Sequence, residues 1–265
     1  HKDIFYLTAS EKINSDCYNF VYFKGKIKKN DLNFEKKIID ETCYKTIQSG
    51  RMQYLDKFKS LIISSGADIL NFKDQSDPKP QNLNSLMGKI LLVDLKSDNK
   101  TIFSSGHRNI LGLVVFDDYI LSTENGPKGG DEINLINYGK NYGWPISSYG
   151  EKYNSISNKE ISYFKSHEDY GFEEPIYSFL PSIGISEIIK LDNKFSKFWN
   201  NNFLIGSLNY RHLLRVNFDK KYTKVRYLEK IFIGERIRDL KYSDKKRVII
   251  LALEDTGSIG ILSNN

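Results

Sequence analysis

Short apolar runs separated by polar turns are the feature that most constrains this chain, because almost no stretch shows the periodicity of a helix. The runs are rich in Ile, Leu, Val, Phe and Tyr, and Asp, Asn, Ser and Lys fill the turns. We expect strands at Asp3–Thr8, Tyr18–Lys26, Ser60–Ser64, Lys89–Leu95, Leu111–Phe116, Tyr119–Ser122, Phe203–Gly206, Leu213–Asn217, Lys224–Phe232 and Arg247–Ala252. Many short strands with frequent turns predict an all-β sandwich, barrel or propeller.

A loose internal repeat favours the propeller. Four segments share a small residue, a strand and usually an acidic or Asn turn: Asn19–Asn33, Met87–Lys100, Ser207–Lys224 and Asp255–Asn265. Their spacing is consistent with blades of about 40–50 residues. A double-sheet sandwich is the alternative that the residues alone leave open.

Composition excludes several classes of protein. The chain has 265 residues, 40% of them hydrophobic, which is too apolar for a disordered chain. It has no apolar run of the roughly 18 residues that a membrane span needs. The net charge of +6 comes from scattered lysines, without the Arg and aromatic stripe of a nucleic-acid-binding surface. We therefore expect one domain over residues 1–265, with no nucleic-acid partner and no membrane span.

Three local features complete the organisation. Cys17 and Cys43 lack the spacing of a metal site, and could form one disulfide or remain two buried thiols. The chain begins with His1 and has no leader, so we expect the natural N-terminus to lie upstream. Residues 147–174 carry little strand signal and are expected to form a long surface loop, which in a compact domain is often functional.

Glycine and polar motifs crowd the middle and the end of the chain. They are Ser105–Leu113 (SGHRNILGL), Ser122–Pro145 (STENGPKGGDEINLINYGKNYGWP), Pro181–Ser186 (PSIGIS) and Gly234–Leu240 (GERIRDL). In this order, they make the chain resemble the soluble PQQ-dependent sugar dehydrogenases, which include soluble glucose dehydrogenase and the aldose sugar dehydrogenases. The resemblance, from His1 to Ile261, implies a six-bladed propeller. At about 50 residues a blade, this chain would supply about five, without the N-terminal blade.

The resemblance implies a site for PQQ, an orthoquinone with three carboxylates. Arginine suits such a ligand because its planar fork binds a carboxylate through two hydrogen bonds. Arg236 and Arg238 are two residues apart and would share one face of a strand. The cofactor-binding residues implied are Arg108, Asn109, Asn125, Gly126, Pro127, Tyr177, Ser182, Arg236 and Arg238. Without the resemblance, the two strand arginines would be interpreted as surface residues paired with Asp239 or Glu235.

Calcium is the second cofactor that the resemblance implies. One Ca²⁺ would bind the backbone carbonyls of Gly126 and Pro127 and contact PQQ, acting as a Lewis acid. A structural Ca²⁺ would lie near Glu132 and Tyr142, with Asp131 as a further candidate ligand. Carbonyl and carboxylate oxygens are the ligands that this hard cation prefers.

The proton-abstracting part of the site departs from the resemblance. A His general base is implied directly before the segment Gln48–Arg51, and this chain has Ile47 there. An alkyl side chain cannot accept a proton, and losing a positioned base typically lowers a rate by about 10²–10⁴. Asp68, His167 and His212 are the candidates for a substitute base, although the sequence does not place them at the site.

Three functions remain open from the sequence. The chain could be a PQQ- and Ca²⁺-dependent aldose dehydrogenase, an inactive propeller that binds PQQ, a sugar or a protein partner, or a structural subunit of a larger assembly. The resemblance implies a periplasmic or extracellular location, and either a homodimer or a partner chain that completes the propeller. Fold alone does not decide among these functions.

Overall fold

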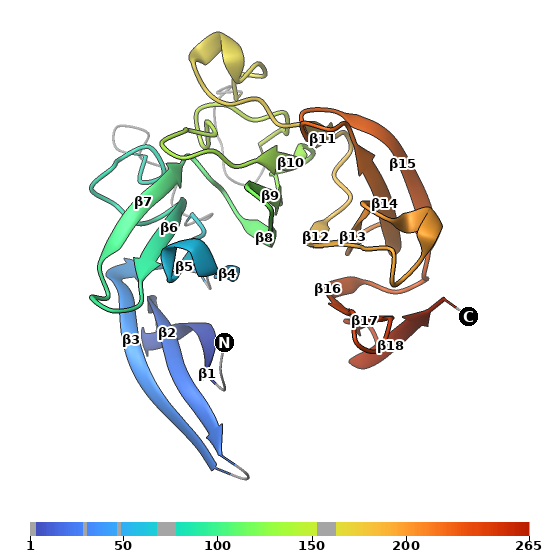
Figure 1. The fold of residues 1–265 in the computed structure, drawn as a ribbon. Coiled ribbons are helices and arrows are strands. Elements are labelled where there is room, and N and C mark those ends of the chain that lie inside the picture. The colour runs from blue at the N-terminus through green and yellow to red at the C-terminus, as the bar shows by residue number, and fades with distance from the viewer. Residues whose placement is uncertain (1–3, 29–30, 47–48, 68–77, 153–162, 265) are drawn as a thin grey trace.

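Five antiparallel sheets, which we number blades 1 to 5 in chain order, follow one another around an arc (Figure 1). The computed structural model describes residues 4–28, 31–46, 49–67, 78–152 and 163–264. Within these ranges the helical segments are three single 3₁₀ turns at Asp56–Phe58, Glu168–Tyr170 and Lys197–Trp199. The prediction of an all-β propeller with about five blades is confirmed, and the sandwich alternative is wrong.

Each blade has three or four strands, and strands that follow one another in the chain are neighbours in the sheet. Blade 1 contains β1 (Ile4–Asn14), β2 (Cys17–Lys28) and β3 (Asp31–Tyr44). Blade 2 contains β4 (Met52–Leu55), β5 (Ser60–Ser64), β6 (Lys89–Asp94) and β7 (Lys100–Ser105). Blade 3 contains β8 (Ile110–Phe116), β9 (Tyr119–Glu124), β10 (Asp131–Leu135) and β11 (Tyr177–Phe179). Blade 4 contains β12 (Ile185–Lys190), β13 (Phe203–Ser207), β14 (His212–Phe218) and β15 (Val225–Phe232), and blade 5 contains β16 (Ile237–Ser243), β17 (Val248–Leu253) and β18 (Ser258–Ser263).

Apolar side chains fill the space between neighbouring blades. Leu61 and Leu91 of blade 2 belong to one buried cluster with Phe20 and Tyr22 of blade 1. Corresponding clusters join blade 2 to blade 3, blade 3 to blade 4 and blade 4 to blade 5. Burial on both faces explains why the central strands are continuous apolar runs rather than alternating ones.

The first strands of blades 2 to 5 lie on the inner side of the arc (Figure 1). Strand β12 approaches both β8 and β16, and β4 approaches β8. Polar side chains near the start of a blade are therefore brought together even when they are far apart in the sequence.

Each predicted strand overlaps an observed one, but several observed strands were not predicted, including β3, β4, β7, β10, β11 and β12. Ser60–Ser64 coincides with β5, and the tight Asp117-Asp118 turn joins β8 to β9 with Asp117 at a φ of 50°. Strand β3 was not predicted, because its sequence (DLNFEKKIIDETCY) is rich in charged residues. It is an edge strand with many exposed side chains, where charges are tolerated and discourage further pairing.

Two other features of the sequence are decided by the structure. Cys17 and Cys43 form a disulfide between β2 and β3, with their Cα atoms 5.0 Å apart. In the part of the chain that the structure describes, no helix is long and apolar enough to cross a bilayer. The loop expected at residues 147–174 is described at 147–152 and 163–174, and Ser147, Ser148 and His167 within it are buried.

Candidate functional site

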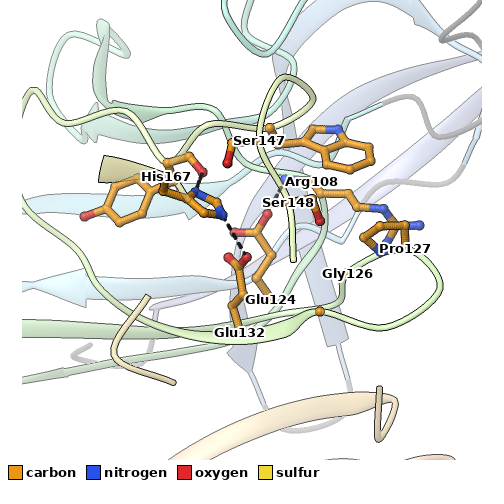
Figure 2. Close-up of a pocket in the computed structure, with 11 residues that line it drawn as sticks. Arg108, Glu124, Gly126, Pro127, Glu132, Ser147, Ser148 and His167 are labelled. Atoms are coloured by element: carbon orange, nitrogen blue, oxygen red, sulfur yellow. Dashed lines mark hydrogen bonds and ion pairs between the residues drawn. The ribbon is translucent and has the colours of Figure 1, made fainter. Parts of the chain in front are cut away.

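A polar pocket lies where the loops of blade 3 meet the buried residues of the 147–174 loop (Figure 2). Its lining brings one guanidinium, two carboxylates and one imidazole together. The residues that line it are Arg108, Glu124, Gly126, Pro127, Gly130, Glu132, Tyr142, Trp144, Ser147, Ser148 and His167. Several of them fall in the motif-rich segments of the middle of the chain, so the structure assembles part of the predicted site here.

Asp131, at the start of β10, holds the loops of blade 3 together. It is fully buried, and its two oxygens accept five hydrogen bonds. The donors are Gly126 N (3.0 Å), Asn125 Nδ2 (3.3 Å), Ser182 Oγ (2.8 Å), Ile183 N (3.0 Å) and Ile185 N (2.9 Å). This carboxylate therefore fixes the Gly126–Pro127 turn and the loop that contains Ser182 in one arrangement.

The Gly126–Pro127 turn is tightly packed. A Cβ atom on Gly126 would lie 2.1 Å from the carbonyl oxygen of Gly130, so only glycine fits. The carbonyl oxygen of Pro127 lies 3.4 Å from the oxygen of Ser182, whose proton has its shorter contact with Asp131. The turn thus has a fixed backbone at the edge of the pocket.

Arg108 lies beside this turn with only 4% of its surface exposed. Its Nη1 donates to the carbonyl and the side-chain oxygens of Asn125, at 2.5 and 3.2 Å. The guanidinium carbon lies 5.3 Å from the centre of the Trp144 ring, in a cation–π contact. The backbone carbonyl of Asn109 accepts the backbone N–H of Asn125 at 2.9 Å, so Arg108, Asn109 and Asn125 form one connected group.

Ser104, His107 and Glu124 form a buried hydrogen-bonded series that sequence reasoning missed. His107 Nε2 is 2.8 Å from Ser104 Oγ, and its Nδ1 is 3.0 Å from Glu124 Oε2. The other Glu124 oxygen accepts the backbone N–H of Arg108. All three residues are buried, at 4% exposure or less, and Tyr142 stacks on the imidazole, so this series fixes the position of Glu124 at the pocket.

Glu132 is the second buried carboxylate of the pocket. Its Oε2 accepts a hydrogen bond from Asn134 Nδ2 at 3.2 Å, and its Oε1 faces His167 Nε2 at 3.5 Å. Burial, together with the nearby Glu124 carboxylate, raises the pKa of Glu132 well above its ordinary value. Burial also lowers the pKa of His167, so burial acts in favour of the neutral form of each group.

Arg236 and Arg238 lie together in blade 5, outside the set of residues that line the pocket. Arg236 Nε is 3.0 Å from one oxygen of Glu254, and Arg238 Nε is 2.5 Å from the other. Their spacing of two places both guanidinium groups on one face, while Ile237 between them is buried. Their partner is Glu254 rather than Glu235 or Asp239. Glu254 directly follows β17, whose last residue, Leu253, pairs with Ile237 between the two arginines.

Tyr177 and Ser182 occupy different environments. Tyr177 is 40% exposed in β11 and contacts Phe179 at 4.8 Å between ring centres. Ser182 is half-buried and belongs to the group held by Asp131. Neither lines the pocket of Figure 2.

The residues considered for proton abstraction are spread through the molecule. Ile47 and Asp68 lie outside the described residues. His212, in β14, donates through Nδ1 to the Tyr210 carbonyl and packs on Phe232. His167 lines the pocket, buried, with its nitrogens facing the Tyr142 carbonyl and Glu132.

A second polar cluster, on the inner side of the arc, was not predicted. Arg51 Nη1 lies 2.6 Å from Glu187 and 3.0 Å from Asp239, which joins blades 2, 4 and 5. Glu187 also accepts the backbone N–H of Leu113 in blade 3 at 3.2 Å. Burial raises the pKa of Glu187 to about 7, although Arg51 acts in the opposite direction. Separations of 136 and 188 residues left no local signal of this cluster in the sequence.

The fold and the pocket define a β-propeller protein with a conformationally fixed polar site in its loops. The family model described as Glucose / Sorbosone dehydrogenase matches residues 1–261, and the chain belongs to this family.

Known relatives agree with this assignment. The chain is 29% identical over 199 residues to the aldose sugar dehydrogenase YliI of Escherichia coli, covering 69% of this chain and 52% of that protein. It is 25% identical over 252 residues to quinoprotein glucose dehydrogenase B of Acinetobacter calcoaceticus, covering 70% and 52%. A solved glucose dehydrogenase structure has a TM-score of 0.80 at 24% identity, covering 99% of this chain and 78% of that one. The chain spans about half the length of the curated relatives it matches.

Proposed function

We propose that this chain is the propeller of a quinoprotein sugar dehydrogenase, which binds PQQ and oxidises an aldose at C1 to the lactone. The observation that carries the proposal is the placement of buried Arg108 beside the Gly126–Pro127 turn, inside a chain that belongs to the Glucose / Sorbosone dehydrogenase family. The names of the two relatives, a sugar dehydrogenase and a quinoprotein, support both the substrate class and the cofactor class.

The residues present fit a ligand with several carboxylates. Arg236, Arg238 and Glu254 together carry a net charge of +1, since two guanidinium groups share one carboxylate. Arg108 adds a third guanidinium in a connected group with Asn109 and Asn125. We propose that the three arginines bind the carboxylates of PQQ and that Asn109 donates a hydrogen bond to it. Tyr177 and Ser182 would line the space beside it.

A calcium ion bound with PQQ also fits the Gly126–Pro127 turn. The turn offers backbone carbonyl oxygens, which Ca²⁺ prefers, and the absence of a side chain at Gly126 allows close approach. Asp131 holds this turn in place through the Gly126 N–H. When bound, PQQ would supply a quinone that accepts a hydride from the sugar.

Proton abstraction is the part of the reaction for which this chain has no predicted base. Ile47 occupies the position of the expected histidine. His167 is buried, and its ring is engaged with Tyr142 and Glu132, so we do not propose it as the base. The substitution at Ile47 favours the second candidate function, a propeller that binds PQQ or a sugar without turnover.

The test combines PQQ binding with dye reduction. The chain is titrated with PQQ in calcium-containing buffer, followed by calorimetry, and then assayed with a set of aldoses. We expect Arg238→Ala to weaken PQQ binding by about tenfold or more, since it removes one charged hydrogen-bonding partner. Arg226→Ala, on exposed β15, is the matched control and should bind PQQ as the unmodified chain does.

The outcomes separate the two candidate functions. Binding with turnover supports the dehydrogenase. Binding without turnover, with activity appearing in Ile47→His, supports the inactive propeller with an otherwise intact site. Absence of PQQ binding at saturating Ca²⁺ would contradict the dehydrogenase and the PQQ-binding form of the inactive propeller.

We also propose a compartment and a partner. The Cys17–Cys43 disulfide is typical of an oxidising environment, which supports the periplasm or the cell exterior.

Apolar side chains are exposed at both ends of the arc, with Leu7 in blade 1 and Ile259 and Ile261 in blade 5 at 52–66% exposure. A further sheet between blades 1 and 5, from the same longer chain, a second copy or a partner chain, would cover them.

A further inference from the structure

The imidazole of His167 lies between the two oxygen-bearing groups for which the family resemblance implies a structural calcium ion. His167 Nδ1 is 3.2 Å from the carbonyl oxygen of Tyr142, and Nε2 is 3.5 Å from Oε1 of Glu132 (Figure 2). The ring therefore lies between the two groups, with Nδ1 hydrogen-bonded to Tyr142 and Nε2 facing Glu132 without a hydrogen bond.

The position of this ring is fixed by its neighbours. His167 is 1% exposed, and the Tyr149 ring stacks on it with centres 5.3 Å apart and planes inclined by 25°. A Cβ atom on Gly143 would lie 2.9 Å from His167 Nδ1, so the backbone of the Tyr142–Gly143 segment presses against the ring. The carbonyl of His167 accepts the backbone N–H of Phe172 at 3.0 Å, which holds the chain that carries the ring.

The Tyr142 carbonyl is equally fixed. The backbone N–H of Tyr142 donates to the Ser105 carbonyl at 2.9 Å, and the Tyr142 hydroxyl donates to the Leu135 carbonyl at 2.6 Å. The hydroxyl also accepts the Asn137 N–H at 2.9 Å. The tyrosine therefore contributes only its backbone oxygen to this part of the pocket, and that oxygen faces His167.

Calcium coordination does not fit this arrangement. Ca²⁺ takes six to eight oxygen ligands at about 2.3–2.6 Å. Because the His167 ring lies between Glu132 Oε1 and the Tyr142 carbonyl, an ion that binds both oxygens would have to displace the ring. The second Glu132 oxygen is already bonded to Asn134. Across the described residues, no group of three or more His, Cys, Asp or Glu side chains could hold a metal ion.

We propose that His167 replaces the structural calcium ion in this chain, so that an imidazole fills the space between Glu132 and the Tyr142 backbone and this site does not bind Ca²⁺. The folding of the pocket loops is then independent of calcium. This inference concerns only the Glu132–Tyr142 site. It does not depend on the calcium ion proposed at the Gly126–Pro127 turn, which would bind together with PQQ.

Calcium binding to the PQQ-free full chain tests the proposal. Thermal unfolding is measured with EDTA and with millimolar CaCl₂, and Tb³⁺ luminescence, excited through nearby aromatic rings such as Trp144 and Tyr149, reports occupancy. For the unmodified chain we expect the same melting temperature in both buffers and no saturable Tb³⁺ signal. A calcium-dependent rise that Glu132→Gln abolishes would overturn the proposal.

Variants at position 167 test whether the imidazole excludes the ion. His167→Asp puts a carboxylate where the ring was, and we expect its melting temperature to rise by several degrees in Ca²⁺, with a saturable Tb³⁺ signal. The rise should vanish in the His167→Asp, Glu132→Gln double variant. His167→Asn, which offers a neutral amide oxygen, serves if the aspartate variant does not fold. A folded position-167 variant that gains no calcium binding would show that the imidazole is not what excludes the ion, and would also overturn the proposal.

Discussion

Asp131 in blade 3 and Glu254 in blade 5 are both carboxylates that organise a group of neighbours, but in opposite ways. Asp131 is fully buried and accepts five hydrogen bonds, three of them from backbone N–H groups. Glu254 is partly exposed, and its side chain binds the two guanidinium groups of Arg236 and Arg238. The first carboxylate fixes backbone, whereas the second balances charge.

The difference indicates how each region would meet a ligand. The turn held by Asp131 has its geometry before any ligand arrives, because moving it would leave buried N–H groups without acceptors. The arginines held by Glu254 can exchange that partner for a ligand carboxylate at little cost, since exposed ion pairs are weak. A fixed backbone site and an adjustable charged site are thus combined in one propeller.

Asp131→Asn is the change expected to have the largest effect. Its amide would place an NH₂ group against backbone N–H donors, so we expect a loss of about 3–5 kcal/mol in the free energy of unfolding. Chemical denaturation monitored by tryptophan fluorescence measures it. Asp118→Asn, at an aspartate that is 89% exposed, is the control and should change stability by less than about 0.5 kcal/mol. Equal effects of the two changes would contradict the distinction.

Glu187 is an intermediate case, being buried but ion-paired with Arg51. Its pKa is raised from 4.5 to about 7, so the unfolded chain releases this proton at a lower pH than the folded chain does. The folded state therefore loses stability as pH rises from about 4.5 to 7, by up to about 3 kcal/mol, and the loss is complete above pH 7. Denaturation at several pH values measures the slope, and Glu187→Gln should flatten it. Parallel pH profiles for the two proteins would contradict this assignment.

Glu254→Gln should have the smallest effect on stability. The ion pairs that it removes are exposed, so we expect a change below about 1 kcal/mol. The two arginines would gain a net positive charge, and PQQ should bind a few-fold more tightly at low salt, with the gain shrinking as salt increases. Calorimetry at two ionic strengths measures both. Weaker PQQ binding would show that Glu254 positions the arginines instead of competing with the ligand.

The fold was largely predictable because its information is local. Apolar runs such as Ser60–Ser64 and turns such as Asp117-Asp118 can be recognised from a few consecutive residues. The charged edge strand β3 was missed because an exposed edge does not need an apolar pattern. Whether the sheets form a sandwich or a propeller depends on how they pack against one another, and the residues alone left that choice open.

The site was only partly predictable because much of it depends on distant contacts. The family resemblance pointed to Arg108 and the Gly126–Pro127 turn, which the structure places together at the pocket. The same reasoning treated Asp131 as a possible metal ligand and did not foresee its role in holding the loops. The contacts of His167 with Tyr142 and Glu132 join separate loops, so no local pattern reveals them.

The junction of Arg51, Glu187 and Asp239 has a consequence for how this sequence can change over time. Each residue comes from a different blade, yet removing one leaves an uncompensated charge near the others. Substitutions at these three positions should therefore be inherited together. In a collection of homologous sequences, they would show correlated replacement across blades, while the outer strands of the same blades drift independently.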